Sequence, residues 1–243
     1  MPDTLALTRW LNEIFGGVVA SVLHMLGISA NPATAINDTF TIELLVTLLL
    51  IAFFVLVRLS LSVENPNPAQ HIAEMIHSFV GEQSEQVIGH GYERFQAYVT
   101  CVGLFVLLVN LAGLIPGITT PSSFPVVTLG VAIPTFFYYN YHGIRANGFL
   151  GFLRSFAGPV WWMAWLIFPI EVVSNLARIL SLTVRLYANM FASDMMTLVA
   201  FSGFPVGLPV LALGLHFFVS LIQAFVFMLL TMIYLSLAVA HEH

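Results

Sequence analysis

Two apolar stretches in the C-terminal half of the chain, residues 159–201 and 205–240, are each longer than one membrane span. An upright helix needs about 20 residues to cross a hydrocarbon core of about 30 Å. At about 1.5 Å per residue, these stretches would form helices of roughly 60 and 50 Å. The simplest arrangement is a hairpin of two strongly tilted helices that turns near Ser202–Pro205. The alternative is a re-entrant break in the first stretch, for which Pro169 is the best candidate.

The composition of the whole chain is that of a membrane protein. Hydrophobic residues make up 59% of the sequence and charged residues 8%, whereas about a quarter of the residues of a soluble domain are charged. The apolar runs are long and unbroken, which predicts helices and not the short alternating strands of an outer-membrane barrel. The formal net charge of −5 is not the basic signature of a nucleic-acid-binding protein. We therefore expect an all-α polytopic membrane protein that binds no nucleic acid.

Residues 36–243 are expected to form a single membrane domain with about five membrane helices, counted by the length of their apolar runs. A loop is expected over His142–Gly158, between the third and fourth of these helices. The predicted spans, including the two arms of the long tilted C-terminal hairpin, are about 40–62, 95–116, 125–142, 159–201 and 205–240.

Two further segments predict amphipathic surface helices. After Asn67-Pro68, a helix-start pattern, residues 68–90 place apolar side chains at helical spacing opposite Glu and Gln. This helix would lie on the cytoplasmic membrane surface or pack on a partner. Residues 1–35 mix polar and apolar residues and predict an external or interfacial segment, with an amphipathic helix and not a span.

The placement of arginine predicts the orientation of the chain. If the spans alternate as expected, the arginines outside them fall on one side, except for Arg9. Basic residues are enriched in cytoplasmic loops. The N-terminal segment is therefore expected outside and the C-terminus in the cytoplasm. The arginines that share the cytoplasmic side are Arg58, Arg94, Arg145 and Arg154.

Residues 171–201 carry four charged side chains within an apolar stretch. Charges at membrane depth cost several kcal/mol unless they face protein or water, so they indicate function. An ion-pair network that only orients the helix is the alternative interpretation. On a helix that turns by about 100° per residue, Asp194 lies about 180° from Arg185. The polar residues within about 40° of Arg185 on such a helix are Glu171, Ser174, Arg178, Ser181 and Asn189.

The last apolar stretch adds His216 and Gln223, which are seven residues apart and therefore nearly on one helix face. In the predicted hairpin, Asp194 lies near the end of one arm and His216 near the start of the other. A carboxylate and an imidazole that lie close together could pass protons along a chain of water molecules. A purely structural donor role for His216 is the alternative.

Three segments of this sequence carry a family resemblance. They are Asn110–Gly117, Arg185–Met190 followed by Asp194, and Gln223–Leu235. Together they resemble the motifs of subunit a of the F-type ATP synthase. The sequence departs from the family pattern at Tyr187 and Ala188, where Phe and Gly are common, and at Asp194, where bacterial members commonly have Glu.

The resemblance implies a stator in the membrane sector Fo, which has no catalytic activity, cofactor or metal of its own. Its implied partners are the ring of c subunits, the peripheral-stalk subunit b, the rest of the F1Fo complex and the lipid membrane. The implied location is a bacterial plasma (inner) membrane. Ion flow through the stator would turn the ring and so drive ATP synthesis, with H⁺ favoured over Na⁺ as the ion.

The resemblance also implies roles for individual residues. Arg185 would meet the ionised ring carboxylates and separate two offset aqueous half-channels. The inner half-channel would be lined by Ser174, Ser181 and Glu171, the last as proton acceptor. Arg178 would either hold Glu171 ionised or serve in packing. The outer half-channel would be lined by Asn189, Asp194, His216 and Gln223.

Three other classes of membrane protein fit the sequence less well. A secondary transporter would show an internal repeat with broken helices in both halves, and the sequence has no such repeat. A bis-histidine haem protein would need paired histidines deep in its spans, and only His216 lies well inside a late span. A structural scaffold would leave the polar residues around Arg185 unexplained.

Overall fold

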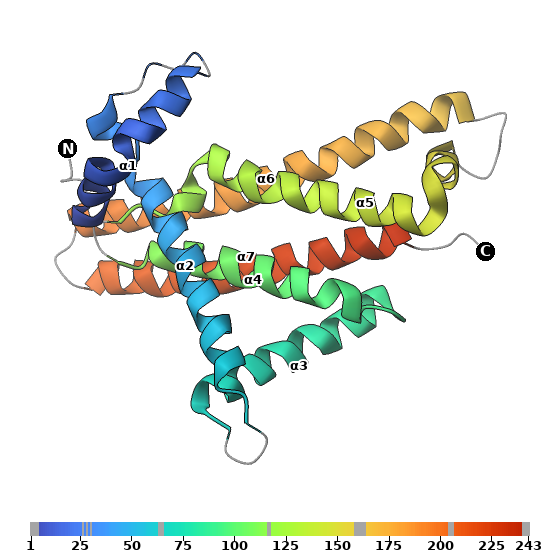
Figure 1. Cartoon of the computed structure of the whole chain (residues 1–243), viewed down its shortest axis with the longest axis horizontal. Coiled ribbons are helices and arrows are strands. Elements are labelled where there is room, and N and C mark those ends of the chain that lie inside the picture. The colour runs from blue at the N-terminus through green and yellow to red at the C-terminus, as the bar shows by residue number, and fades with distance from the viewer. Residues whose placement is uncertain are drawn as a thin grey trace.

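A computed structural model of the chain describes residues 5–25, 27, 29, 31–62, 66–115, 118–157, 164–203 and 207–239. Residues 149, 150, 152–157 and 164 are described by their backbone alone. All regular structure in these ranges is helical, which confirms the all-α fold (Figure 1). The elements are α1 Ala6–Met25, η1 Pro32–Thr34, α2 Asp38–Leu59, α3 Pro68–Ile88, α4 Glu93–Ala112, η2 Pro121–Ser123, α5 Pro125–Ala157, α6 Ala164–Gly203 and α7 Gly207–Val239.

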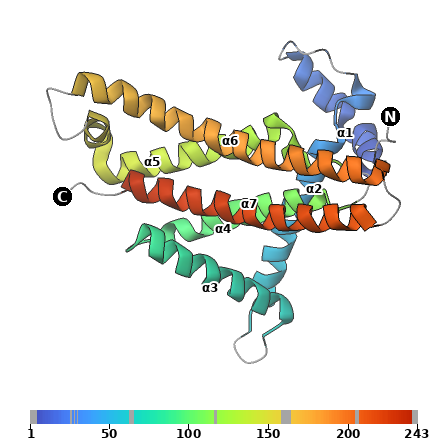
Figure 2. The same cartoon turned by 180° about the vertical axis from the view of Figure 1, so that it is seen from behind.

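Helices α4 to α7 run alongside one another in two layers, and α2 crosses them at a steep angle (Figure 1). The layer of α6 and α7 faces the viewer in Figure 2, with α5 and α4 behind it. The buried core between the layers includes Val99, Val106, Leu186, Phe227 and Leu235. Among the described helices, α2, α4, α6 and α7 are long and apolar enough to cross a bilayer. This confirms a polytopic membrane protein.

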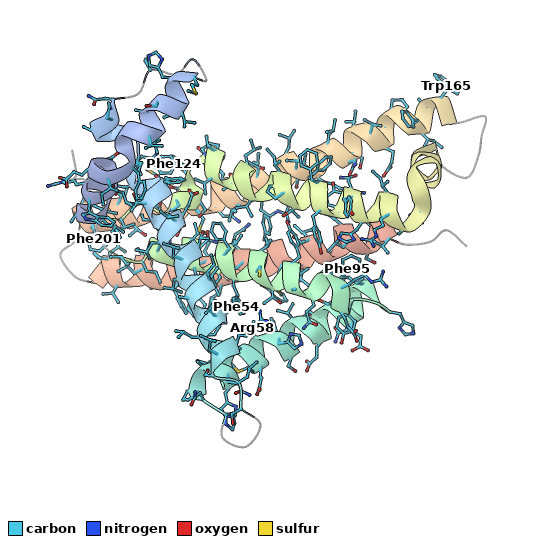
Figure 3. All side chains as sticks on the ribbon, in the orientation of Figure 1. Phe54, Arg58, Phe95, Phe124, Trp165 and Phe201 are labelled. Atoms are coloured by element: carbon cyan, nitrogen blue, oxygen red, sulfur yellow. The ribbon has the colours of Figure 1, made fainter. Side chains whose placement is uncertain are left out.

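The two long helices predicted for the C-terminal half are present. Helix α6 has 40 residues and α7 has 33, and Trp165 and Phe201 mark the two ends of α6 in Figure 3. Helices of that length fit a core of about 30 Å only at a tilt of roughly 50–60°. The alternative of a break at Pro169 is wrong, because α6 continues through this residue. Pro169 lies near the helix start, where it removes one backbone hydrogen bond. Of the turn predicted at Ser202–Pro205, Ser202 and Gly203 still belong to α6, and Phe204 and Pro205 lie outside the described residues.

The loop predicted over His142–Gly158 is helical as far as Ala157, and Gly158 lies outside the described residues. Helix α5 continues from Pro125 to Ala157 with one interruption at Gly148, whose φ of 70° and ψ of 161° suit a residue without a Cβ. Apolar residues such as Ile144 continue to favour a helix where Arg145 and the glycines had indicated a loop. Helix α5 is not among the four apolar helices, because its tyrosines, Asn140 and His142 lower its hydropathy. The predicted span 125–142 therefore stays a prediction.

Both predicted amphipathic segments form helices. Helix α3 begins at Pro68, directly after Asn67, and ends before Gly89. It packs on α4 and α7. Helix α1 packs on η1 and on the start of α2. Asn37 caps α2, since its side-chain oxygen accepts a hydrogen bond from the Phe40 backbone N–H.

Candidate functional site

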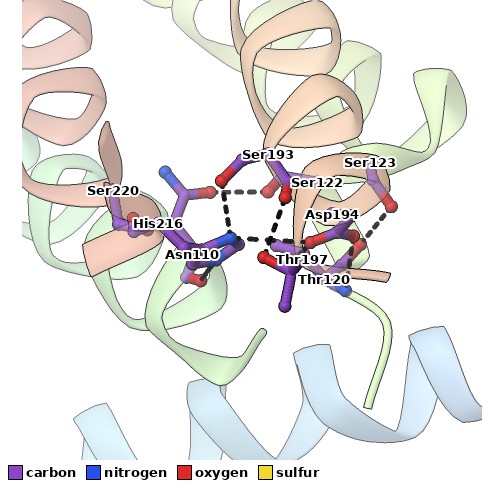
Figure 4. A network of polar contacts seen from close by, with 9 residues as sticks. All are labelled: Asn110, Thr120, Ser122, Ser123, Ser193, Asp194, Thr197, His216 and Ser220. Atoms are coloured by element: carbon purple, nitrogen blue, oxygen red, sulfur yellow. Dashed lines mark hydrogen bonds and ion pairs between the residues drawn. The ribbon is translucent and has the colours of Figure 1, made fainter. Parts of the chain in front are cut away.

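Asp194 of α6 and His216 of α7 meet in a buried polar cluster where α4, η2, α6 and α7 come together (Figure 4). The His216 Nδ1 atom lies 3.7 Å from Asp194 Oδ1, so their predicted proximity is confirmed. Thr120 donates to the Asp194 carboxylate through its backbone N–H at 3.1 Å and its hydroxyl at 2.6 Å. This carboxylate therefore has two fixed donors and an adjacent imidazole.

The hydrogen bonds of His216 determine which nitrogen of its ring can exchange a proton. The side chain is fully buried, and its Nε2 atom lies 3.2 Å from the backbone oxygen of Asn110. A carbonyl oxygen only accepts, so Nε2 carries a hydrogen and donates it. In the neutral ring, Nδ1 then accepts from the Ser193 hydroxyl at 2.8 Å. A second proton would bind at Nδ1, on the side of Ser193 and Asp194.

Several residues of this cluster were missed by the sequence prediction. Thr120, Ser122 and Ser193 were not expected in the site, and Asn110 was part of a family motif without an assigned role. The Ser122 hydroxyl donates to Asn110 Oδ1. The Asn110 Nδ2 amide is buried and has no hydrogen-bond partner within the described part of the chain. Thr120 and Ser122 lie at or next to the short helix η2, where no long helical period indicates which way a side chain faces, so only the folded chain brings Thr120 to Asp194.

A second polar cluster lies near the other end of α6. Glu171 Oε1 is 3.8 Å from Arg178 Nη2, and the Arg178 guanidinium lies over the Tyr234 ring, 5.3 Å from its centre. Arg178 thus makes both contacts that the sequence left as alternatives, an ion pair and a packing contact.

Behind this ion pair, a chain of neutral side chains joins α5 to α6. The Tyr139 hydroxyl donates to Asn175 Oδ1 at 2.8 Å. The Asn175 amide in turn donates to Asn140 Oδ1 at 3.0 Å. None of these three residues was predicted for the site, although Asn175 lies within the polar stretch of α6. They fix the position of α6 against α5 at the level of Glu171.

Arg185 lies on α6 between the two clusters. Its guanidinium donates to the Ser181 hydroxyl at 3.4 Å, and no ion pair of Arg185 occurs in the residues that the structure describes. One turn further along, Asn189 donates to Gln223 Oε1 at 2.7 Å, which joins two predicted site residues from α6 and α7.

The face of α6 that carries Arg185 includes several small, exposed side chains. Small residues let another helix approach the backbone of α6 closely. A single unpaired cation on such a surface can attract a carboxylate carried by a second protein. The exposed small residues on this face are Ser174, Ala177, Ser181, Ala188 and Ala192.

The order of these groups along α6 separates the two clusters. Glu171 and Arg185 are 14 residues apart, which is about 21 Å along the helix axis at 1.5 Å per residue. Asp194 lies about 13 Å from Arg185 in the other direction by the same rise. The helix thus carries one carboxylate on each side of a central cation.

Comparison with known proteins decides the family. The family model described as ATP synthase A chain matches residues 40–236. The chain belongs to the ATP synthase subunit a family. All three motifs that suggested this family in the sequence lie inside the matched residues, whereas α1 lies outside them.

Curated members of the subunit a family align with most of the chain. The chain is 49% identical to ATP synthase subunit a of Koribacter versatilis over 244 residues, covering all of both proteins. It is 44% identical to that of Solibacter usitatus over 203 residues, 84% of this chain and 87% of the relative. Identity to that of Sulfurimonas denitrificans is 39% over 178 residues, 73% of this chain and 80% of the relative.

Proposed function

We propose that this protein is the stator of an ATP synthase Fo motor, which carries protons to and from the carboxylates of a c-ring through two offset aqueous half-channels. The observation that carries the proposal is the position of Arg185. Within the described part of the chain it forms no ion pair, and it lies on a face of α6 with several small exposed residues, between two polar clusters that share no residue. The protein itself catalyses no reaction, and its proton flow drives ring rotation.

Arginine suits the central position because its guanidinium stays protonated where a lysine can lose its charge. It attracts an ionised ring carboxylate without carrying a proton itself. A ring site that leaves Arg185 must take up a proton before it enters lipid, because a charge in hydrocarbon is costly. Arg185 thereby prevents protons from passing directly between the two half-channels.

The cluster around Asp194 serves as the end of the outer half-channel. Asp194 Oδ1 and His216 Nδ1 are 3.7 Å apart, beyond hydrogen-bond reach, so a proton would move between them through a bridging water molecule. Asn189 and Gln223 lead from this cluster toward Arg185. The buried Asn110 amide without a protein partner offers a donor to water, which is how such groups are commonly satisfied.

The cluster around Glu171 serves as the entrance to the inner half-channel. Glu171 accepts the proton that leaves the ring, and Ser174 and Ser181 line the path from Arg185. Both serines are exposed on the Arg185 face of α6. Arg178 pairs with Glu171 and packs on Tyr234, so it both positions the carboxylate and joins α6 to α7.

The proposed partners are the c-ring, the peripheral-stalk subunit b and the remaining F1Fo complex, in a bacterial plasma membrane. Arg58 lies in the last turn of α2 and Arg94 in the first turn of α4, at the two ends joined by α3. Two basic residues on this side favour a cytoplasmic position for it. The C-terminus is then cytoplasmic as well, and the loop around η2 is external.

A reconstituted complex tests the function and the ion. We expect the chain to purify with a c-ring and an F1 head, and the complex in liposomes to make ATP when a pH gradient is imposed. A sodium gradient of equal size should drive no synthesis. Synthesis driven by sodium alone would contradict the choice of ion, and an intact complex that responds to neither gradient would contradict the proposal.

The substitution Gly113→Ala should disable the outer half-channel. A Cβ at residue 113 would collide with the Thr120 hydroxyl and lie 3.0 Å from His216 Nε2. Thr120 would have to move away from Asp194, and proton-driven ATP synthesis should fall at least tenfold. The matched control is Gly103→Ala within α4, the helix that Gly113 caps, since a Cβ there makes an ordinary 3.5 Å contact with Met228. Equal activity of the two variants would show that the Thr120–Asp194 contact is dispensable.

A further inference from the structure

Helix α1 exposes a stripe of apolar side chains and buries the polar side chains of Thr8 and Asn12 on another side. The exposed side chains share one side of the helix, with Val18 64% and Met25 88% exposed. In a soluble domain an apolar stripe of this width would face the core. The residues of this exposed apolar face are Leu7, Trp10, Ile14, Phe15, Val18, Val22 and Met25.

Hydrogen bonds hold the side of α1 that carries Thr8 and Asn12 against the segment that leads into α2. The Asn12 side chain donates to the Ile36 carbonyl and accepts from the Ile36 N–H, both at 2.9 Å. The Thr8 hydroxyl donates to the Thr41 hydroxyl at 3.0 Å. The paired bonds of Asn12 fix the rotation of α1 about its own axis. The apolar face is thereby held facing away from this segment.

The position of α1 relative to α2 indicates what lies against the apolar face. The 22 residues of α2 are about 33 Å long, which matches a hydrocarbon core of about 30 Å, so each end of α2 lies near a membrane surface. Helices α1 and α3 lie at opposite ends of α2 in Figure 1, where α3 runs across its direction and α1 runs obliquely to it. Helix α1 is thus placed at the level of one membrane surface.

We propose that α1 lies in the lipid headgroup region of the leaflet in which α2 begins, with its apolar face toward the acyl chains. Helix α2, on which α1 packs, is long and apolar enough to span a membrane and also exposes apolar side chains, which include Phe40, Leu45 and Leu48. Trp10 belongs to the residue types that gather at membrane interfaces. Glu13 is exposed beside the apolar face, as the charged flank of an interfacial helix should be.

This inference concerns residues outside the matched family region and does not depend on the proposed proton path. Its test uses neighbouring positions on α1, each changed singly to cysteine in the complete complex with Cys101→Ser. Ile14 and Val18 lie on the apolar face, while Glu13 and Gly17 are exposed one residue away. Each cysteine carries a bimane fluorophore, and the complex is placed in vesicles of phosphatidylcholine and phosphatidylglycerol.

Two quenchers distinguish the environments. Lipids brominated on the acyl chain should quench positions 14 and 18 several-fold more than 13 and 17, and iodide on both sides of the membrane should show the reverse order. Strong iodide quenching at all four positions would show that α1 stands in water and overturn the proposal. If neither quencher reaches 14 and 18, a protein covers this face instead of lipid, which would also overturn it.

Discussion

Replacing Arg185 with alanine should abolish proton-driven ATP synthesis, and replacing it with lysine should not restore it. In the proposed mechanism, alanine removes the charge that holds the ionised ring carboxylate between the two half-channels. Lysine restores a charge, but a buried ammonium loses its proton more readily than a guanidinium and lacks its fixed fork of donors. Synthesis by the reconstituted complex under an imposed pH gradient should fall to background in both variants.

The controls for Arg185 are the same two substitutions at Arg145. This residue is exposed on α5, and the proposed mechanism assigns it no role, so Arg145→Ala and Arg145→Lys should keep most of the activity. Purification with the c-ring shows that each variant assembles. Normal synthesis by an assembled Arg185→Ala or Arg185→Lys complex would remove Arg185 from the mechanism.

Single cysteines along α6 should react with a hydrophilic, membrane-impermeant thiol reagent from two different sides. In a Cys101→Ser background, positions 171, 174 and 181 should be labelled only from the cytoplasmic side, and position 194 only from outside. The reason is geometric, because Glu171 and Asp194 lie on opposite sides of Arg185 along the helix, with Glu171 paired to Arg178 of α6 and Asp194 beside His216 of α7. Two water-filled spaces of this kind approach the ring without joining. Labelling in right-side-out and inverted vesicles gives the measurement.

The control position for this labelling is Val184, whose side chain is 57% exposed on an apolar part of α6. A cysteine there should stay unlabelled from either side, because lipid excludes the hydrophilic reagent. Continuous labelling from 171 to 194 from a single side would indicate one through-pore and contradict the two-half-channel arrangement. Labelling with the two sides exchanged would instead reverse the proposed topology.

The parts of the fold predicted from sequence were those that depend on the length of the apolar runs and on the period of the α-helix. Apolar runs of about twice the bilayer thickness require long helices, and a hairpin of two such helices brings residues near its turn together. That reasoning anticipated the contact between Asp194 and His216. The end of α5 was predicted wrongly because Arg145 and several glycines suggested a loop. In the structure Arg145 lies exposed on the helix surface, and the helix is interrupted at a single glycine, Gly148.

The residues that complete the clusters could not be predicted in the same way. Thr120 lies in an irregular connection, and its bonds to Asp194 depend on how the chain between α4 and α5 folds over α6. Tyr139 and Asn140 lie on α5, which is less apolar than α2, α4, α6 and α7. Its sequence has no clear hydrophobic period that would indicate which side of the helix faces α6. Contacts between polar side chains on different helices depend on how each helix is rotated about its axis and how far it is shifted along its neighbour. The spacing of residues along one helix specifies neither.

The unbroken backbone of α6 has a mechanical consequence for a stator. Each elementary charge that crosses the membrane releases about 2.3 kcal/mol per 100 mV, and a turning ring would deliver part of it as a sideways push on Arg185. This residue projects from a 40-residue helix that continues through Pro169 and is braced by α5 and α7. The push would be resisted by consecutive backbone hydrogen bonds and two flanking helices. A support of that stiffness stores little of each step as elastic bending, so more of the energy reaches the rotor as torque.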